Sequence, residues 1–220
     1  MTSSNLDKIH FSCRLIEYIR SLVDDVVSVD IGVAYVKRSG VELLKELLDK
    51  IESCRVVTSL SFNLTEPEAL EALLNRRIRV KIYKEKNDFH PKVYIFKLRD
   101  GRAIVCVGSS NLSKGGLRDN VEANICFMGK PNVSPIKEVL EFFEDILWNS
   151  LASVDLTKEL LEEYKRARYI PPKLATPKSL QVRIESILRN NVKCFISGER
   201  RYWLLITDRD NFEKCLEYGL

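Results

Sequence analysis

Histidine is scarce in this sequence, and the cysteines lack the close spacing that metal sites use. The 220 residues include two histidines, His10 and His90, and six cysteines with no Cys-x-x-Cys pair. One chain therefore cannot supply a site built from several histidine ligands. Most of the cysteines lie in apolar segments, so we expect buried free thiols rather than disulfides or metal ligands.

Long apolar runs are missing as well. The longest, such as 104–107 and 204–206, are far shorter than the roughly 20 residues that a helix needs to cross a bilayer. Residues 1–8 are polar and are not followed by the apolar block and cleavage site of a secretory signal. We therefore expect a cytoplasmic protein with no membrane partner.

The composition is that of a folded domain. Apolar residues make up 45% and charged residues 30%, with nine glycines and seven prolines, which excludes a low-complexity or disordered chain. The formal net charge of +4 permits contact with nucleic acid without requiring it, because phosphate binding depends on a local cluster of positive charge.

Helical and strand-like patterns alternate over the first 83 residues. Three segments of helical spacing are each followed by a strand-like run: 11–23 then 27–36, 41–51 then 55–60, and 66–75 then 78–83. A capping box, Thr65 with Glu68, is predicted to start the third helix. Such alternation predicts an α/β fold whose sheet is largely parallel and carries helices on both faces.

The pattern changes after residue 90. Strands at 93–96 and 103–107 are joined through Arg99-Asp100-Gly101, a hairpin signal, and 121–128 adds another strand, so the sheet is predicted to be mixed. Ser134-Pro135 opens one further helix and Asp155 caps another over 156–168.

Three prolines in 169–177 predict a linker there. We expect a main domain over 1–168 and a small α+β segment over 178–220. This segment is too short to bury an independent hydrophobic core, and it fits part of an incomplete second domain.

The segment 89–124 carries the chemistry: FHPKVYIFKLRDGRAIVCVGSSNLSKGGLRDNVEAN. Side chains alternate along a strand, so His90 and Lys92 point to the same side. The next strand ends in Gly108-Ser109-Ser110-Asn111, whose N–H groups, hydroxyls and amide can face an anion. Glu122 begins the third strand, where a carboxylate could touch the imidazole. A cation, neutral donors, a nucleophile and a carboxylate together suit a phosphate ester.

This arrangement resembles the half-site of the phospholipase D superfamily: His-x-Lys, then Gly-Ser-x-Asn, then Glu eleven positions after the Asn. The wording FHPKVYIF and GSSNLS resembles the nuclease branch, which includes metal-independent restriction endonucleases and helicase-associated nuclease domains. The resemblance covers about residues 25–150. Any single element would be weak, whereas the combination is specific.

The resemblance implies a residue-by-residue role. One histidine attacks phosphorus to form a phosphohistidine, the histidine of a second half-site protonates the leaving oxygen, and water completes hydrolysis. His90 would be the nucleophile or acid, Lys92 and Asn111 would bind phosphoryl oxygens with Ser109 and Ser110 in support, and Glu122 would orient His90. No metal and no other cofactor are implied.

Two departures from the family pattern matter. Lys97 occupies the position where the family often places Asp, so no carboxylate role transfers there. One motif is present where two are required, and His10 is not followed by x-Lys. We therefore predict a two-fold homodimer, joined through the active-site face, in which both His90 side chains meet.

The predicted substrate is DNA, with RNA as the alternative, so the function predicted is a restriction-type endonuclease. Lys114 and Arg118 would guide nucleic acid to the site, although a solvated helical face explains them equally well. Three rivals stay open: a non-catalytic nucleic-acid-binding module of the same fold, a lipid phosphodiesterase, and a Mg²⁺-dependent nuclease suggested by the Glu-x-Lys spacing of Glu163 and Lys165.

Overall fold

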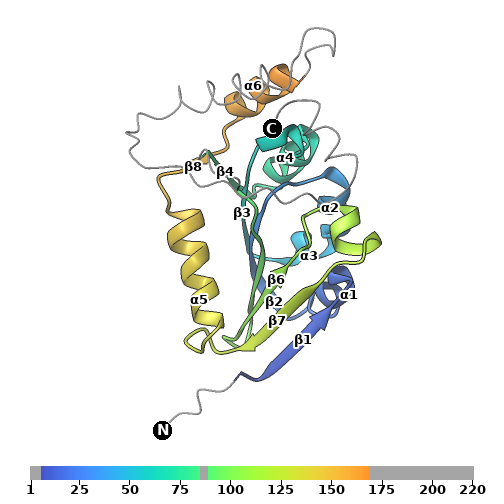
Figure 1. The fold of residues 1–220 in the computed structure, drawn as a ribbon, viewed down its shortest axis with the longest axis vertical. Coiled ribbons are helices and arrows are strands. Elements are labelled where there is room, and N and C mark those ends of the chain that lie inside the picture. Colours follow the sequence, from blue (N-terminus) through green and yellow to red (C-terminus); the bar gives the residue numbers. More distant parts are fainter. Residues whose placement is uncertain (1–5, 85–88, 169–220) are drawn as a thin grey trace, which may run out of the picture. The chain divides into compact units, whose positions relative to one another are not determined.

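A computed structural model describes residues 6–84 and 89–168 (Figure 1). The chain divides into two units, Met1–Lys165 and Arg166–Leu220, and all the described strands belong to the first unit. The predicted linker 169–177 and the predicted segment 178–220 lie outside the described residues.

Eight strands form one sheet in the order β1-β7-β6-β5-β2-β3-β4-β8. The strands are β1 (Lys8–Ser12), β2 (Val26–Val33), β3 (Ser53–Thr58), β4 (Arg79–Tyr83), β5 (Lys92–Leu98), β6 (Ala103–Gly108), β7 (Asn124–Gly129) and β8 (Ser153–Asp155). The helices are α1 (Leu15–Arg20), α2 (Arg38–Leu43), α3 (Lys45–Lys50), η1 (Ser61–Asn63), α4 (Pro67–Asn75), η2 (Gly115–Asp119), α5 (Ile136–Glu141), η3 (Phe142–Trp148) and α6 (Lys158–Arg168).

The sheet is mixed, as the sequence predicts, but it is not largely parallel. Only β2–β3 and β3–β4 are parallel among the described strand pairs, and the other five neighbouring pairs are antiparallel. Helical crossovers enforce parallel pairing only over residues 26–83, whereas β5, β6 and β7 follow one another as a meander and β1 and β8 add antiparallel edges. The predicted α/β class is confirmed, whereas the prediction that most strand pairs are parallel is wrong.

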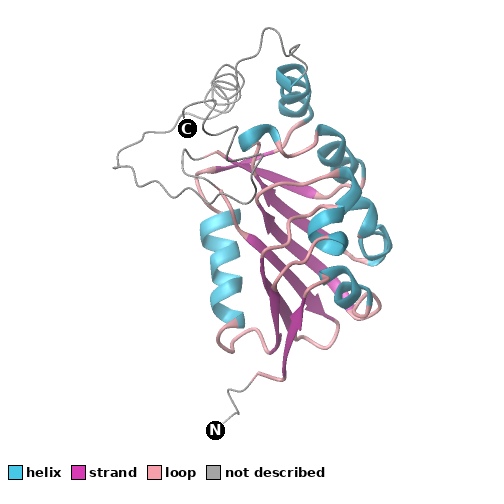
Figure 2. Cartoon of the chain, turned by 45° about the vertical axis from the view of Figure 1, so that its right-hand side comes forward, coloured by secondary structure: helices cyan, strands magenta, loops and turns pink. Residues whose placement is uncertain are grey.

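Helices lie on both faces of the sheet, as predicted (Figure 2). The helices α1 to α4 cover one face, and the continuous helical segment α5–η3 covers the middle of the other. Under α5–η3 the sheet packs Val57, Val93, Ile95 and Val105 against Phe143 and Leu147, all of them buried. This apolar layer fixes the central strands, whose ends carry the motif residues.

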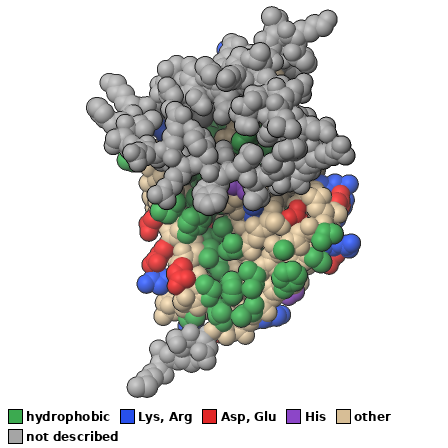
Figure 3. All heavy atoms as spheres, viewed as in Figure 1, with side chains coloured by type: hydrophobic (Ala, Val, Ile, Leu, Met, Phe, Trp, Pro, Cys, Tyr) green, Lys and Arg blue, Asp and Glu red, His purple; other side chains and the backbone are tan. Residues whose placement is uncertain are grey.

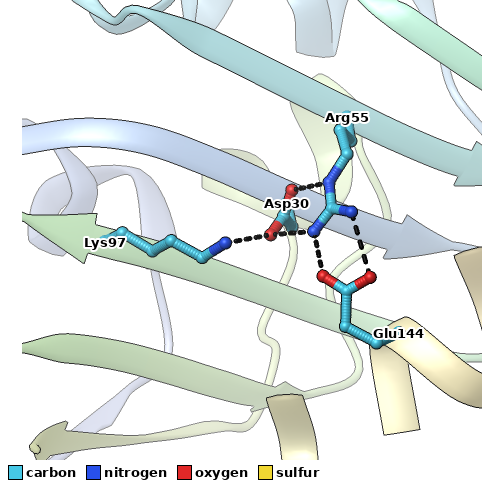
Figure 4. A network of polar contacts seen from close by, with 4 residues as sticks. All are labelled: Asp30, Arg55, Lys97 and Glu144. Carbon is cyan, nitrogen blue, oxygen red and sulfur yellow. Dashed lines mark hydrogen bonds and ion pairs between the residues drawn. The ribbon is translucent and has the colours of Figure 1, made fainter. Parts of the chain in front are cut away.

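A polar network crosses the same face of the sheet (Figure 4). Arg55 of β3 donates from Nε to Asp30 Oδ1 of β2 at 2.6 Å and from Nη2 to Asp30 Oδ2 at 2.8 Å. Its Nη1 reaches Glu144 Oε2 of η3 at 3.1 Å, and Lys97 Nζ of β5 lies 3.4 Å from Asp30 Oδ2. Because Asp30 and Arg55 are largely buried, each charge depends on its partners.

Two elements are missed by the sequence patterns. No pattern predicts the edge strands β1 and β8, and Phe11, predicted to open the first helix, lies on β1 with 67% of its surface exposed. The helix α1 therefore begins only at Leu15. Both edge strands are short and gain their order from pairing with strands remote in sequence, which periodicity cannot detect.

Predicted helix starts also need correction. Thr65 does not form a capping box, since Glu66 is the N-cap of α4 and no side chain caps it. The Thr65 hydroxyl is buried and donates instead to the carbonyl of Ser59 at 2.7 Å. Asp155 ends β8, and the Thr157 hydroxyl accepts from the N–H of Leu160 at 3.1 Å at the start of α6.

The expectation of free thiols is wrong for one pair. Cys106 of β6 and Cys126 of β7 face each other directly in the antiparallel ladder and form a disulfide. Cys13 and Cys54 are free. Among the described residues, no helix is both long and apolar enough to span a bilayer.

Candidate active site

The motif residues gather at one edge of the sheet. His90 and Lys92 stand at the start of β5, the Ser109–Asn111 turn follows the end of β6, and Glu122 precedes the start of β7. Because β6 runs antiparallel to both β5 and β7, these three chain positions meet at the same edge. The end of β2 and the loop with Tyr35 reach this edge too, since β2 is antiparallel to β5.

Lys92 and His90 are in direct contact. The Lys92 side chain is almost fully buried, with the residue 7% exposed, whereas His90 is exposed. Lys92 Nζ lies 2.7 Å from Nδ1 and 2.8 Å from Nε2 of His90, and it donates to the His90 carbonyl at 3.0 Å. Lys92 Nζ is therefore within hydrogen-bonding distance of both ring nitrogens, and a neutral ring can accept only at its unprotonated nitrogen.

Burial lowers the pKa of Lys92 to about 8, and the negative charge of Glu122 opposes that effect. Near pH 7 the amine is still largely protonated, but its charge is poorly solvated. A phosphate group placed beside it would supply the missing counter-charge. The pair is therefore suited to an anionic ligand, with an exposed imidazole next to a buried cation.

The two serines of the turn have different surroundings. Ser109 is exposed, and its hydroxyl donates to Oε2 of Glu122 and accepts from the N–H of Ala123 at 3.0 Å. Ser110 is fully buried, and its hydroxyl accepts from Asn124 Nδ2 at 2.9 Å. The hydroxyl of Ser110 therefore holds the turn against β7, and only Ser109 of the two faces solvent.

Gly108 allows this turn to lie tightly against β7. A Cβ at Gly108 would collide with the backbone oxygen of Ala123 and with the Asn124 side chain. The close approach lets the N–H of Ser109 donate to the Ala123 carbonyl at 3.1 Å. A side chain here would move the turn away from Glu122.

Glu122 lies beside the turn, on the loop that precedes β7. The sequence predicts that Glu122 begins this strand, whereas β7 begins two residues later, at Asn124. Its Oε1 accepts from Asn120 Nδ2 at 3.2 Å, and its Oε2 accepts from Ser109. The carboxylate also acts on the pKa of Lys92 across the site. Its role in orienting His90 stays a prediction, and its contacts place it beside the Ser109 turn.

Two tyrosines join the site that the sequence patterns did not identify. The N–H of Tyr35 donates to Asn111 Oδ1 at 3.3 Å, which orients the amide of Asn111. The hydroxyl of Tyr94 is buried and donates to the carbonyl of Ser110 at 3.1 Å. Burial raises the pKa of both phenols, Asn111 lowers that of Tyr35, and Glu122 raises both further.

Strand alternation would have found one of these tyrosines. Tyr94 lies two residues after Lys92 on β5, so it shares the face of the strand that carries the ammonium. No local signal marks Tyr35, because it reaches the site only through the antiparallel pairing of β2 with β5.

Lys114 and Arg118 lie beside the site. Lys114 directly precedes η2, and Arg118 is part of η2. Lys114 Nζ is 3.3 Å from Asp119 Oδ2, and Arg118 Nε is 2.8 Å from Asp119 Oδ1. Both cations are partly exposed and share this one carboxylate, which lowers the local positive charge. Within the described residues, no three His, Cys, Asp or Glu side chains converge as metal ligands would.

The comparisons with known proteins concern the family and the fold of the chain. Residues 19–147 match a family model described as "Cardiolipin synthase, PLD-like domain". No curated protein matches the sequence significantly.

Among solved structures, Nuc of Salmonella typhimurium, a phospholipase D family member, is 18% identical with a TM-score of 0.51, covering 69% of this chain and 97% of its own. Phosphatidylserine synthase of Haemophilus influenzae is 14% identical with a TM-score of 0.52, covering 84% of this chain and 45% of its own. These likenesses concern the fold. Since the family model spans more than half of the sequence and contains every motif residue, the chain belongs to the PLD-like domain family.

Proposed function

We propose that the chain is a metal-independent phosphodiester hydrolase that cleaves nucleic acid through a phosphohistidine. The observation that carries the proposal is the exposed imidazole of His90 held 2.7 Å from the buried ammonium of Lys92, at an edge that also presents Ser109 and Asn111. A neutral imidazole is a competent nucleophile near pH 7, and the cation and neutral donors stabilise the charge that develops on the phosphoryl oxygens.

In the first step the unprotonated nitrogen of His90 attacks phosphorus. The phosphorus–nitrogen bond forms as the bond to the leaving oxygen breaks, and that oxygen takes a proton from an acid. Lys92 and Asn111 bind the non-bridging oxygens. In the second step water attacks phosphorus and gives its proton to the group that acted as the acid, so His90 is released and a phosphomonoester remains.

The acid is proposed to be His90 of a second subunit. The sequence contains one other histidine, His10, and that ring is stacked on Tyr18 of α1 with a centroid distance of 4.2 Å. A two-fold axis through the site would make the two imidazoles equivalent, one attacking and the other donating a proton. One copy of this fold can make up nearly a whole chain in another protein, since the match covers 97% of the Nuc chain. In the phosphatidylserine synthase chain the match covers 45%.

DNA is the proposed substrate because the sequence segments FHPKVYIF and GSSNLS resemble those of the nuclease branch of the superfamily. A lipid phosphodiester is the second candidate, and the observation in its favour is the family model, whose description names cardiolipin synthase. Both substrates present the same phosphodiester to His90, so the two candidates differ only in the alcohols on either side.

The test is cleavage of plasmid and single-stranded DNA by the purified full chain in excess EDTA. We expect activity in the wild type and in His10→Ala, the matched histidine control, and none in His90→Ala. Alkali-stable, acid-labile radiolabel trapped on the protein would identify the phosphohistidine. Cleavage that needs added Mg²⁺, or that survives in His90→Ala, would reject the mechanism, and release of headgroup from phospholipid with inert DNA would select the lipid substrate.

Mixed subunits test the shared site. A fixed amount of wild type is mixed with a growing excess of His90→Ala under conditions that exchange subunits. Mixed dimers hold one imidazole, so at a fixed amount of wild type the activity should fall in proportion to the wild-type fraction rather than stay constant. Constant activity would show that one subunit suffices.

A further inference from the structure

The two faces of the sheet differ in what they offer a ligand at the candidate site. Figure 3 shows apolar side chains gathered on one surface of the molecule. Two exposed apolar residues of the sheet, Val107 of β6 and Ile125 of β7, lie in one row with Val93 of β5. Lys92 precedes Val93 on β5, so its side chain points to the opposite face. A phosphate bound at Lys92 is therefore surrounded by groups of that opposite face.

Tyr35 reaches the site from the loop that follows β2. The antiparallel pairing of β2 with β5 continues past the end of β2, where the N–H of Ala34 donates to the Pro91 carbonyl at 3.0 Å. One step further in this register, Tyr35 stands opposite His90. The loop thus brings an aromatic residue to the imidazole from a strand that carries none of the motif residues.

A second pairing sets Tyr35 beside Asn111. Val36 forms a parallel bridge with Leu112, so the residues that precede them lie level with each other. The N–H of Tyr35 accordingly donates to Asn111 Oδ1 at 3.3 Å. This contact directs the oxygen of the amide toward the backbone of Tyr35 and leaves the nitrogen end, Nδ2, as the donor for a ligand.

The phenol of Tyr35 lies among the polar groups of the site. The residue is partly buried, and burial raises the pKa of its hydroxyl, Asn111 lowers this pKa and the charge of Glu122 raises it. The charge of Glu122 and the phenol of Tyr35 also raise the pKa of Tyr94. Because a free phenol has a pKa near 10, the hydroxyl of Tyr35 keeps its proton throughout the neutral range.

Two other hydroxyls of the site already have an acceptor. Ser109 donates to the carboxylate of Glu122, and Tyr94 donates to the carbonyl of Ser110. Among the described residues, no carboxylate or carbonyl accepts a hydrogen bond from the hydroxyl of Tyr35. Its proton is therefore available to a ligand.

We infer that the hydroxyl of Tyr35 is a further phosphate-binding group of this site, an inference that rests on the proposed function. In the complex it donates to a non-bridging oxygen of the phosphoryl group that Lys92 and Asn111 also contact. A hydrogen bond to a charged acceptor in a poorly solvated place is among the stronger ones. Loss of the hydroxyl should therefore weaken phosphate binding and slow cleavage.

The competing role for a phenol at this place is that of the acid that protonates the leaving oxygen. Two observations favour a donor that keeps its proton. The amide of Asn111, which is proposed to bind a non-bridging oxygen, is the direct neighbour of Tyr35. A phenol whose pKa is raised gives up its proton less readily near pH 7 than an imidazolium does.

The first test is the affinity of the purified full chain for inorganic phosphate, measured by calorimetry. Tyr35→Phe keeps the ring and the N–H that orients Asn111 and removes only the hydroxyl, so phosphate should bind about tenfold more weakly or worse. Tyr18→Phe is the matched control, because Tyr18 is a buried tyrosine of α1 and its change should leave the affinity unaltered. Equal affinity in Tyr35→Phe and wild type, or no phosphate binding by wild type, overturns the inference.

A second measurement uses the wild type labelled with carbon-13 at the ζ carbon of tyrosine. Added phosphate should shift one tyrosine resonance, and that resonance should be missing from the spectrum of Tyr35→Phe. A spectrum in which phosphate moves no tyrosine resonance contradicts the contact.

Cleavage in excess EDTA separates the two roles of the phenol. In bis(4-nitrophenyl) phosphate the leaving nitrophenolate needs no proton, whereas the alkoxide that leaves from DNA does. A phosphate-binding hydroxyl predicts the same loss of kcat/KM in Tyr35→Phe, about tenfold or more, on both substrates. A loss confined to DNA makes Tyr35 the acid and overturns the inference.

The outcomes also separate this inference from the proposed function. Unchanged hydrolysis and phosphate binding in Tyr35→Phe reject the role of the hydroxyl and leave the hydrolase standing. Phosphate binding that depends on Tyr35, in a wild type that hydrolyses neither substrate, supports the role of the hydroxyl and rejects the proposed function.

Discussion

Replacing Lys92 by methionine should make the fold more stable at neutral pH while abolishing activity. The ammonium is buried, and its pKa in the fold is about 8 against an ordinary value of 10.5. Each pKa unit corresponds to about 1.4 kcal/mol, so holding the charge in this place costs the fold about 3 kcal/mol. Methionine fills a similar volume without a charge to desolvate, and it removes the cation that the phosphoryl group needs.

The sign of the pH dependence follows from the two pKa values. Below pH 8 the amine is protonated in both states, and the folded state bears the full cost. Between about pH 8 and 10.5 the folded state loses the proton first, so wild-type stability rises with pH. Above pH 10.5 both states are neutral, and the advantage of Lys92→Met should vanish.

Urea unfolding of wild type and Lys92→Met at pH 7, 9 and 11 measures this difference in the free energy of unfolding. Lys137→Met is the matched control: Lys137 is exposed and pairs with Glu141, so its change should stay within about 0.5 kcal/mol. A Lys92→Met protein that is less stable than wild type at pH 7, or an advantage that does not shrink with pH, would refute the argument.

Further predictions concern the network under α5–η3 and the site. Asp30→Ala removes one of the two carboxylates that bind the largely buried guanidinium of Arg55 and leaves Glu144 as the other, so it should cost about 1–3 kcal/mol in urea unfolding; a loss below about 0.5 kcal/mol would contradict this. Gly108→Ala forces the turn away from β7, so cleavage should fall at least about tenfold in kcat while circular dichroism stays unchanged. Glu122→Gln removes a charge that raises the pKa of Lys92, so the alkaline limb of the pH–rate profile should move to lower pH, whereas an unmoved limb would disconnect the two residues.

Local patterns predict much of this site because its residues are close in sequence. The alternation along β5 places His90 beside Lys92, and the hairpin through Gly101, whose φ is +82°, returns β6 to the same edge. These features depend on strand geometry alone, so one sequence suffices to expect them. The role of each side chain in catalysis stays a prediction.

What the patterns miss depends on pairings between distant segments. Tyr35 meets Asn111 because β2 lies next to β5 although 76 residues separate the two side chains. The disulfide between Cys106 and Cys126 follows from the register of β6 against β7, not from any Cys spacing. The prediction of a largely parallel sheet is wrong because local patterns locate the strands, whereas tertiary packing decides which strands become neighbours.

The contact between Lys97 and Asp30 couples two positions on neighbouring strands. An aspartate at position 97, the residue that the family often places there, would face the carboxylate of Asp30 across the ladder. Such a change would replace one of the two cations beside Asp30 by a like charge and leave Arg55 as the other. Engineers who graft β5 of a relative into this scaffold should therefore exchange both strands together, because the electrostatic compatibility of the sheet is inherited as a pair.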